Sequence, residues 1–258
     1  HRSVFYQQDI LSVNQFNKDD MNYLFHRADE MLAMCNRWGT CDLLKDYTLS
    51  CVFYEPSTRT SSSFISAMVR LGGKVIPITE GIQYSSVSKG ESLIDSMLTL
   101  EQYCDVIVLR HPEIGSSATA AKYVKVPIIN AGDGAGEHPT QALLDLYTIK
   151  SELGTLDGLK VAMIGDLRYG RTVHSLTRLL SQYDVSLRFV SPDTLRLPLE
   201  LMNDLIDKGV KVRETNKVAD VIENADVLYV TRIQKERFSD LAQYEEVKNY
   251  FEITPELM

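Results

Sequence analysis

The sequence predicts an α/β protein with two tandem doubly wound parallel-sheet domains. Short runs rich in β-branched residues alternate with helix-like apolar patterns along the chain, which is typical of mostly parallel sheets. The 258 residues suit two modest domains. The alternation stops at a turn-forming GTLDG segment, residues 154–158, and then restarts. We therefore expect one domain over residues 1–153 and a second over residues 154–258.

The first domain is expected to open with an amphipathic helix over residues 19–35, which carry Met21, Phe25 and Leu32 at helical spacing. Short apolar runs then predict strands, and longer periodic segments predict helices between them. The final helix has Pro139 in its first turn and Gly154 just past its end, a common pair of helix signals. The expected strands are 49–54, 74–78, 105–109 and 126–129, and the expected helices are 60–71, 92–102, 116–123 and 139–153.

The second domain repeats this alternation and ends in a polar helical stretch over residues 235–250. We expect it to be incomplete, because no later segment is present that could pack back on the first domain. The first residue is His1 and not Met, so the chain is expected to be a segment of a longer protein. The expected strands are 160–164, 186–190, 210–212 and 226–230, and the expected helices are 172–182, 199–208 and 217–224.

The composition and net charge limit the kinds of molecule that the chain is expected to bind. The chain is 44% hydrophobic and 24% charged, which is typical of a globular protein, and its formal charge is −8. An acidic balance argues against binding nucleic acid or an anionic membrane, but not against a small anion that responds to local charge. The longest apolar runs fall far short of the roughly 20 residues of a membrane span. Four cysteines without a Cys-x-x-Cys pair make a zinc site or disulfide framework unexpected and favour a reducing compartment, the cytoplasm.

Polar and charged side chains follow the predicted strands, at their carboxyl ends. Ligands of open parallel sheets bind at these ends. Cationic groups therefore gather at the same edge of both predicted sheets, although the whole chain is acidic. The segments are STRT at 57–60, RHP at 110–112, NAGD at 130–133 with HPTQ at 138–141, GDLRYGR at 165–171 and TRIQK at 231–235.

Two of these segments favour an anion. At 57–60, free N–H groups at a helix start, three hydroxyl groups and Arg59 would hold a phosphate, although a simple Ser or Thr cap explains the same pattern. Arg110 follows a buried strand, where an arginine needs a partner; that partner is either a ligand or a structural salt bridge. His138 could cap a helix, but with Gln141 one turn later both side chains can face a ligand at the helix N-terminus.

Two loops complete the candidate region. Gly165 and Gly170 match neither common nucleotide-binding loop pattern, since Arg171 follows the second glycine, so we do not expect a dinucleotide. Residues 80–91 lack periodicity and form a polar, Ser- and Gly-rich segment of the kind that closes over a site. Lys89 lies in this segment and on its own would be a solvated surface lysine.

Taken together, these stretches resemble the aspartate/ornithine carbamoyltransferase family, in family order over nearly the whole chain. The STRT motif marks the family, and the contexts of Arg171 and Arg232 favour aspartate over ornithine. The surrounding sequence is similar to the corresponding domain of animal-type multifunctional pyrimidine-synthesis proteins. The matching stretches are FYEPSTRTSSSF at 53–64, VSKGE at 87–91, RHP at 110–112, NAGDG at 130–134, HPTQALLD at 138–145, GDLxxGRTVHSL at 165–176 and TRIQKER at 231–237.

The resemblance implies transfer of a carbamoyl group from carbamoyl phosphate to L-aspartate in pyrimidine biosynthesis, by a homotrimer whose sites are shared between subunits. It implies a phosphate site at Ser57, Thr58, Arg59 and Thr60. It implies carbamoyl phosphate contacts from Arg110, His138 and Gln141, with Ser86 from the neighbouring subunit. It implies aspartate contacts from Arg171, Arg232 and Gln234, with Lys89 from the neighbour. The catalytic set would be Arg59, Thr60, Lys89, Arg110 and His138.

The family also carries a His-Pro-x-Pro-Arg loop beyond the last position of this chain. The resemblance implies that this loop completes the substrate site. It also implies that the chain is fused to other pyrimidine-pathway domains. The chemistry requires no metal or organic cofactor, because phosphate is a good leaving group and cations can hold the repelling anions together. Two alternatives stay open: a carbamoyltransferase for another amine such as ornithine, and a non-catalytic trimerising module.

Overall fold

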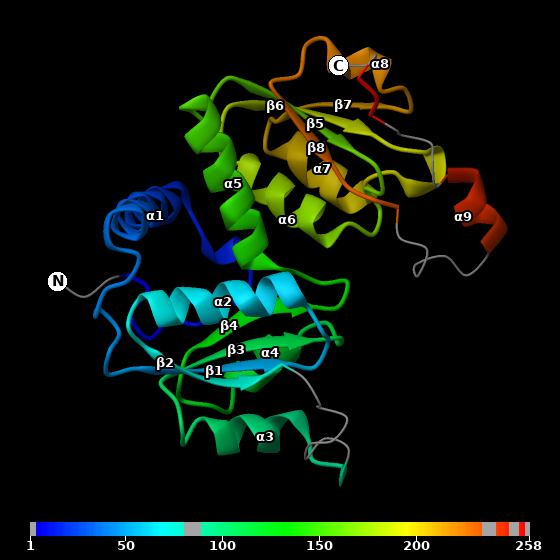
Figure 1. Ribbon diagram of the computed structural model, residues 1–258. Helices are drawn as coiled ribbons and strands as arrows, with labels where there is room; N and C mark the ends of the chain where they lie inside the picture. Colours follow the sequence, from blue (N-terminus) through cyan, green and yellow to red (C-terminus); the bar gives the residue numbers. More distant parts are fainter. Residues whose placement is uncertain (1–3, 80–88, 234–240, 248–252, 256–258) are drawn as a thin grey trace. The chain divides into compact units, whose positions relative to one another are not determined.

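A computed structural model describes residues 4–79, 89–233, 241–247 and 253–255. The chain divides into two compact units, His1–Thr140 and Gln141–Met258. Each unit is built on a four-stranded parallel sheet with helices against it (Figure 1). The predicted α/β fold of two tandem parallel-sheet domains is therefore confirmed. The division between the units falls in the first turn of α5 (Pro139–Leu153). The boundary predicted between residues 153 and 154, at the other end of this helix, stays a prediction.

The sheet of the first unit has the strand order β2-β1-β3-β4. The chain passes from β1 outward to β2 and then returns to place β3 on the other side of β1. The direction of winding thus reverses between β1 and β3. Such reversals are where parallel sheets bind ligands, because the connections leave on opposite faces and open a crevice between them. The strands are β1 (Thr48–Phe53), β2 (Lys74–Ile78), β3 (Val106–His111) and β4 (Ile128–Asp133).

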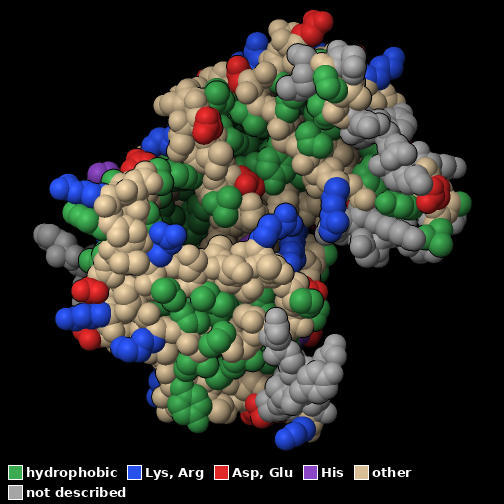
Figure 2. Space-filling model, viewed as in Figure 1, with side chains coloured by type: hydrophobic (Ala, Val, Ile, Leu, Met, Phe, Trp, Pro, Cys, Tyr) green, Lys and Arg blue, Asp and Glu red, His purple; other side chains and the backbone are tan. Residues whose placement is uncertain are grey.

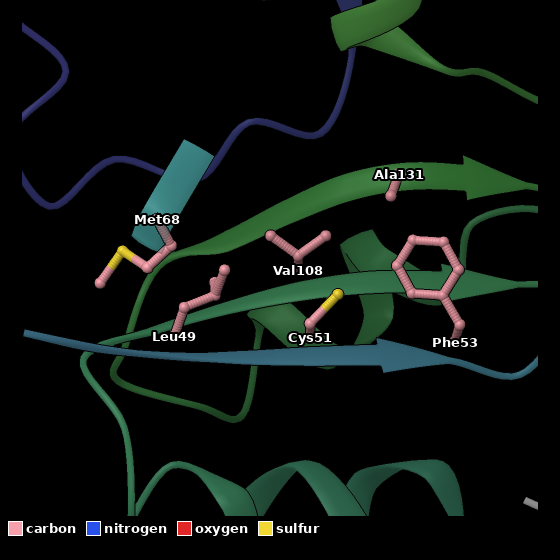
Figure 3. Close-up of a cluster of buried hydrophobic side chains, with 6 residues drawn as sticks. All are labelled: Leu49, Cys51, Phe53, Met68, Val108 and Ala131. Carbon is pink, nitrogen blue, oxygen red and sulfur yellow. The ribbon is translucent and has the colours of Figure 1, made fainter. Parts of the chain in front are cut away.

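Helices cover both faces of this sheet (Figure 1). Alternate residues of β1 point to opposite faces, as the pleat requires. On one face Leu49, Cys51 and Phe53 lie in a buried cluster with Met68 of α2, and Figure 3 shows these side chains together. On the other face Val52 packs in a cluster that includes residues of α3 and α4. The helices of this unit are α1 (Lys18–Trp38), α2 (Thr58–Arg70), α3 (Leu93–Leu100) and α4 (Ser116–Ala121).

The sheet of the second unit has the order β7-β6-β5-β8, so its winding reverses between β5 and β8. Ala162 and Ile164 of β5 lie in a buried cluster with Val221 of α8, while α6 and α7 lie on the other face (Figure 1). The strands are β5 (Leu159–Ile164), β6 (Val185–Val190), β7 (Lys211–Thr215) and β8 (Val227–Val230). The helices are α6 (Arg171–Leu180), α7 (Leu199–Asp207), α8 (Ala219–Ile222) and α9 (Leu241–Val247). Among the described helices, none has both the length and the apolar character to cross a membrane.

Three element ends differ from the prediction and bear on the site. Helix α2 begins at Thr58 and not at residue 60. Strands β3 and β4 continue past the predicted ends at 109 and 129, to His111 and Asp133. The predicted ends were wrong because they followed the last apolar residue, whereas the backbone ladder continues: Phe53 is paired with Arg110. The polar side chains at these ends therefore stand on rigid strands.

Candidate active site

The strands β1 and β3 end side by side at the reversal of the first sheet. The Tyr54 N–H donates to the Arg110 carbonyl over 2.8 Å, which holds the two ends together. The chain leaving β1 then enters α2 at Thr58. The segment 57–60 and the side chain of Arg110 therefore share the edge of the sheet at which ligands bind.

The start of α2 has free backbone donors. Ser57 is the N-cap residue, but its side chain makes no capping hydrogen bond within the described chain. Its carbonyl oxygen instead accepts from the Ser61 N–H over 3.0 Å and from the Ser61 hydroxyl over 2.8 Å. The N–H groups of the first turn, from Thr58 to Thr60, thus have no partner in the helix. Ser57 is thus the N-cap by position, but its hydroxyl does not cap the helix within the described chain, and the helix start suits an anion with Arg59 exposed beside it.

Arg110 is mostly buried and only loosely paired. Its side chain is 14% exposed, its Nη1 donates to the Ala131 carbonyl over 3.3 Å, and its Nε lies 3.7 Å from Oε2 of Glu55. That distance is too long for a hydrogen bond, and the buried Nε has no hydrogen-bond partner among the described residues. Burial lowers the pKa of Arg110, an effect that Glu55 opposes, and arginine still stays charged. The salt-bridge alternative is therefore true only in part, and donors are left for a ligand.

The segment between β4 and α5 presents His138, which is buried. Asn130 and Asp133 support this segment: Asn130 Oδ1 accepts from the Gly132 N–H over 2.9 Å, and Asp133 Oδ2 accepts from the Gly115 N–H over 2.9 Å. Gly134, at φ 61°, lets the segment pack so closely that a Cβ there would lie 2.1 Å from the Pro112 carbonyl oxygen. Asp133 thus ties the end of β4 to the start of α4, and Gly134 lies against Pro112 in the segment that follows β3.

The second sheet places two arginines at its own reversal. Thr231, just after β8, donates its N–H to the Ile164 carbonyl at the end of β5 over 2.8 Å. Arg171 is the first residue of α6, which follows β5, and Arg232 is the next residue after Thr231 and is exposed. Gly165 permits this approach, because at φ 123° a Cβ would lie 2.0 Å from the Thr231 carbonyl oxygen. Arg232 therefore follows a strand end that is held to the end of β5, and Arg171 begins the helix reached by the loop after β5.

A hydrogen-bonded group centred on Asp145 escaped the sequence prediction. Gln141 Nε2 donates to Asp145 Oδ1 over 3.0 Å, and the Tyr229 hydroxyl donates to Asp145 Oδ2 over 2.8 Å. Burial raises the pKa of Asp145, and these two donors oppose that shift. The spacing of Gln141 and Asp145, one helical turn apart, is a signal that could have paired them from the sequence. The contact with Tyr229, which is 84 residues away in the chain, left no such signal.

Three further residues were predicted to contact a ligand. Lys89 is exposed, and Ser86 and Gln234 lie outside the described residues. In the described part of the chain no group of three or more His, Cys, Asp or Glu side chains is placed to hold a metal ion. On the face seen in Figure 2, basic and acidic side chains are interspersed over both units. That face therefore shows no broad basic surface.

Two family models match the chain. The model of the aspartate/ornithine carbamoyltransferase carbamoyl-P binding domain covers residues 8–151, and that of the Asp/Orn binding domain covers residues 157–258. The multifunctional protein pyr1-3 of Dictyostelium discoideum is 51% identical over 246 residues, which are 95% of this chain. The chain spans 11% of the length of that relative.

Smaller relatives and solved structures match over most of their length. The aspartate carbamoyltransferase catalytic subunit of Leptospira biflexa is 50% identical over 255 residues, which are 99% of this chain and 82% of that protein. The solved structure of aspartate transcarbamoylase from Trypanosoma cruzi in complex with carbamoyl phosphate superposes with a TM-score of 0.91 at 42% identity. The match covers 98% of this chain and 80% of that one.

Proposed function

Because this chain belongs to the aspartate/ornithine carbamoyltransferase family, we propose that it is an aspartate carbamoyltransferase. It transfers the carbamoyl group of carbamoyl phosphate to the α-amine of L-aspartate and releases phosphate. One observation carries the proposal: donors and cations stand at the winding reversal of both parallel sheets. The test supplies carbamoyl phosphate and L-aspartate to the full-length protein and measures the carbamoyl-aspartate that forms. A chain that assembles but forms no product would favour the non-catalytic alternative.

The first unit suits carbamoyl phosphate. The free N–H groups of α2, with Ser57, Thr58, Arg59 and Thr60, would hold its phosphate, whose charge is close to −2. As the amine adds to the carbamoyl carbon, negative charge grows on the carbonyl oxygen. Thr60, Arg110 and His138 would donate to that oxygen, and one well-placed donor contributes about 3 kcal/mol. The new C–N bond forms in this addition; the C–O bond to phosphate then breaks, and the departing phosphate takes up the proton that the amine loses.

The second unit suits an acceptor with two carboxylates. Arg171 begins the helix that follows β5, Arg232 comes just after β8, and a planar guanidinium group binds two carboxylate oxygens at once. Ornithine has one carboxylate and an additional cation, which two arginines would repel. Gln234, by family resemblance, would add a further contact.

The acceptor preference gives a direct test. We expect aspartate to be carbamoylated far more efficiently than ornithine, and Arg232→Met to raise the KM for aspartate by about 10- to 100-fold, because one charge-assisted carboxylate contact is lost. Arg168→Met is the matched control, since Arg168 is exposed and stacks on Tyr169 instead. Initial rates over a range of each substrate decide the result. Equal use of ornithine, or an unchanged KM in Arg232→Met, contradicts the assignment.

We further propose a homotrimer in which Ser86 and Lys89 act in the neighbouring subunit's site. Family resemblance supports this arrangement, and Lys89 is exposed and so accessible to a neighbour. Arg59→Ala and Lys89→Ala chains should each be inactive. When the two are dissociated, mixed equally and reassembled, about a quarter of the sites in a closed ring would receive both intact residues. Activity near that fraction is expected, and no recovery would contradict shared sites.

The cellular role follows from the same assignment. We propose that the chain serves de novo pyrimidine synthesis in the cytoplasm as one domain of a multifunctional protein. The likeness to pyr1-3 supports the fusion, and the free thiols of all four cysteines suit a reducing compartment. The gene should restore growth without added pyrimidine to a strain that lacks aspartate carbamoyltransferase. Failure of the active protein to do so would contradict the role.

A further inference from the structure

Asp145 lies one helical turn after Gln141 on α5 and is partly buried. Each of its carboxylate oxygens accepts one hydrogen bond, from Gln141 Nε2 over 3.0 Å and from the Tyr229 hydroxyl over 2.8 Å. Two elements of the second unit thus meet at this carboxylate: α5, which carries Asp145 and Gln141, and β8, which carries Tyr229.

An ionised carboxylate only accepts hydrogen bonds, whereas a glutamine amide has an accepting end and a donating end. Gln141 must therefore turn its NH₂ group toward Asp145. The opposite orientation would set two acceptor oxygens against each other in a partly buried place, which is costly. Its Oε1 is then the end left to face away from Asp145, where it can only accept.

We propose that Asp145 is a positioning residue that fixes the orientation of the Gln141 amide, so that the site selects a substrate NH₂ group over a carboxylate oxygen. This inference rests on the proposed function, in which Gln141 contacts the carbamoyl group. A carbamoyl NH₂ donates to Oε1, whereas a carboxylate in the same place would meet a second acceptor. Such mismatches discriminate strongly, because they leave buried polar groups unpaired.

Tyr229 determines how an amide at position 145 would be oriented. The Tyr229 hydroxyl directs its proton to Asp145 Oδ2 over 2.8 Å. In Asp145→Asn the phenol would hold the new amide by its oxygen and leave the amide NH₂ facing Gln141. Gln141 would then reverse and present its own NH₂ group to the ligand. The exchange of a single oxygen for nitrogen is thus expected to shift the preference toward a carboxylate.

The test compares three ligands by calorimetry on the full chain: inorganic phosphate, phosphonoacetamide and phosphonoacetate. Phosphonoacetamide carries an amide in the position of the carbamoyl group, and phosphonoacetate carries a carboxylate there. In Asp145→Asn we expect the ratio of amide to carboxylate affinity to fall by about tenfold or more. The affinity for inorganic phosphate, which has neither an amide nor a carboxylate group, should stay within about twofold. Asp226→Asn is the matched control, since Asp226 accepts the Lys160 N–H over 2.7 Å at the amino end of β5, and its ratio should not change.

An unchanged ratio in Asp145→Asn overturns the inference, as does an equal loss of affinity for all three ligands, which indicates a merely structural role. If Asp145→Asn does not fold, Gln141→Leu decides: the selectivity should disappear, and its persistence overturns the inference. Failure of the proposed function looks different, because the wild-type chain would then bind none of the three ligands, and this outcome overturns both.

Discussion

Replacing Arg110 by methionine is expected to lower kcat by about two to three orders of magnitude, the usual cost of removing one donor to a developing oxyanion. Methionine keeps much of the apolar stem and removes the guanidinium group. The loss should be large because the Arg110 guanidinium has a buried N–H without a hydrogen-bond partner among the described residues and is held only loosely by Glu55. Steady-state rates at saturating substrates measure the effect.

Two further variants separate this role from a structural one. Arg188→Met removes a strand arginine of the other sheet that donates to the Val221 carbonyl over 3.5 Å, and its kcat should stay near that of the wild type. Glu55→Gln removes the ion-pair partner of Arg110, and should change kcat by less than about tenfold, since partly exposed pairs contribute little. A kcat for Arg110→Met close to that of Arg188→Met would show that Arg110 does not stabilise the transition state.

Local signals in the sequence predicted much of the fold. The bounds predicted for α5 agree with the structure because Pro139 and Gly154 mark its two ends. Strand β2 was predicted with the correct bounds, because its apolar run ends at the same residue as its ladder. The strand ends that carry Arg110 and Asp133 were predicted too early, since hydrogen bonds between strands depend on a partner and not on local polarity.

The sequence also predicted that the candidate cations follow strand ends. It did not predict which strand ends lie next to each other. Only the strand orders place β1 beside β3 and β5 beside β8, and strand order depends on contacts distant in the chain. The same holds for the Ser57 hydroxyl, which makes no capping hydrogen bond within the described residues, since a capping residue and a ligand residue have the same local sequence. The pairing of Asp145 with Tyr229 depends on how α5 packs near β8.

Gly165→Ala is expected to lower the free energy of unfolding of the second unit by about 3 kcal/mol, through a disfavoured backbone angle and a collision. Gly165 has φ 123°, and a Cβ there would lie 2.0 Å from the Thr231 carbonyl oxygen. The obstacle is backbone, so no side chain can move aside, and the ends of β5 and β8 must part. Arg232 follows Thr231 directly, so we also expect the KM for aspartate to rise at least about tenfold where the variant is folded, as binding geometry is lost.

Gly158→Ala separates the collision from the backbone angle. Gly158 also has a positive φ, 81°, but no described atom lies within 4 Å of its would-be Cβ. This variant should lose only about 1 kcal/mol and keep the wild-type KM for aspartate. Urea unfolding and initial rates at varied aspartate compare the two alanine variants. If both lose the same stability and both keep the wild-type KM, the close approach of β5 and β8 does not position Arg232. If Gly165→Ala alone raises the KM, the separation of these two strand ends controls aspartate binding, because the two variants differ chiefly in what the added methyl group meets.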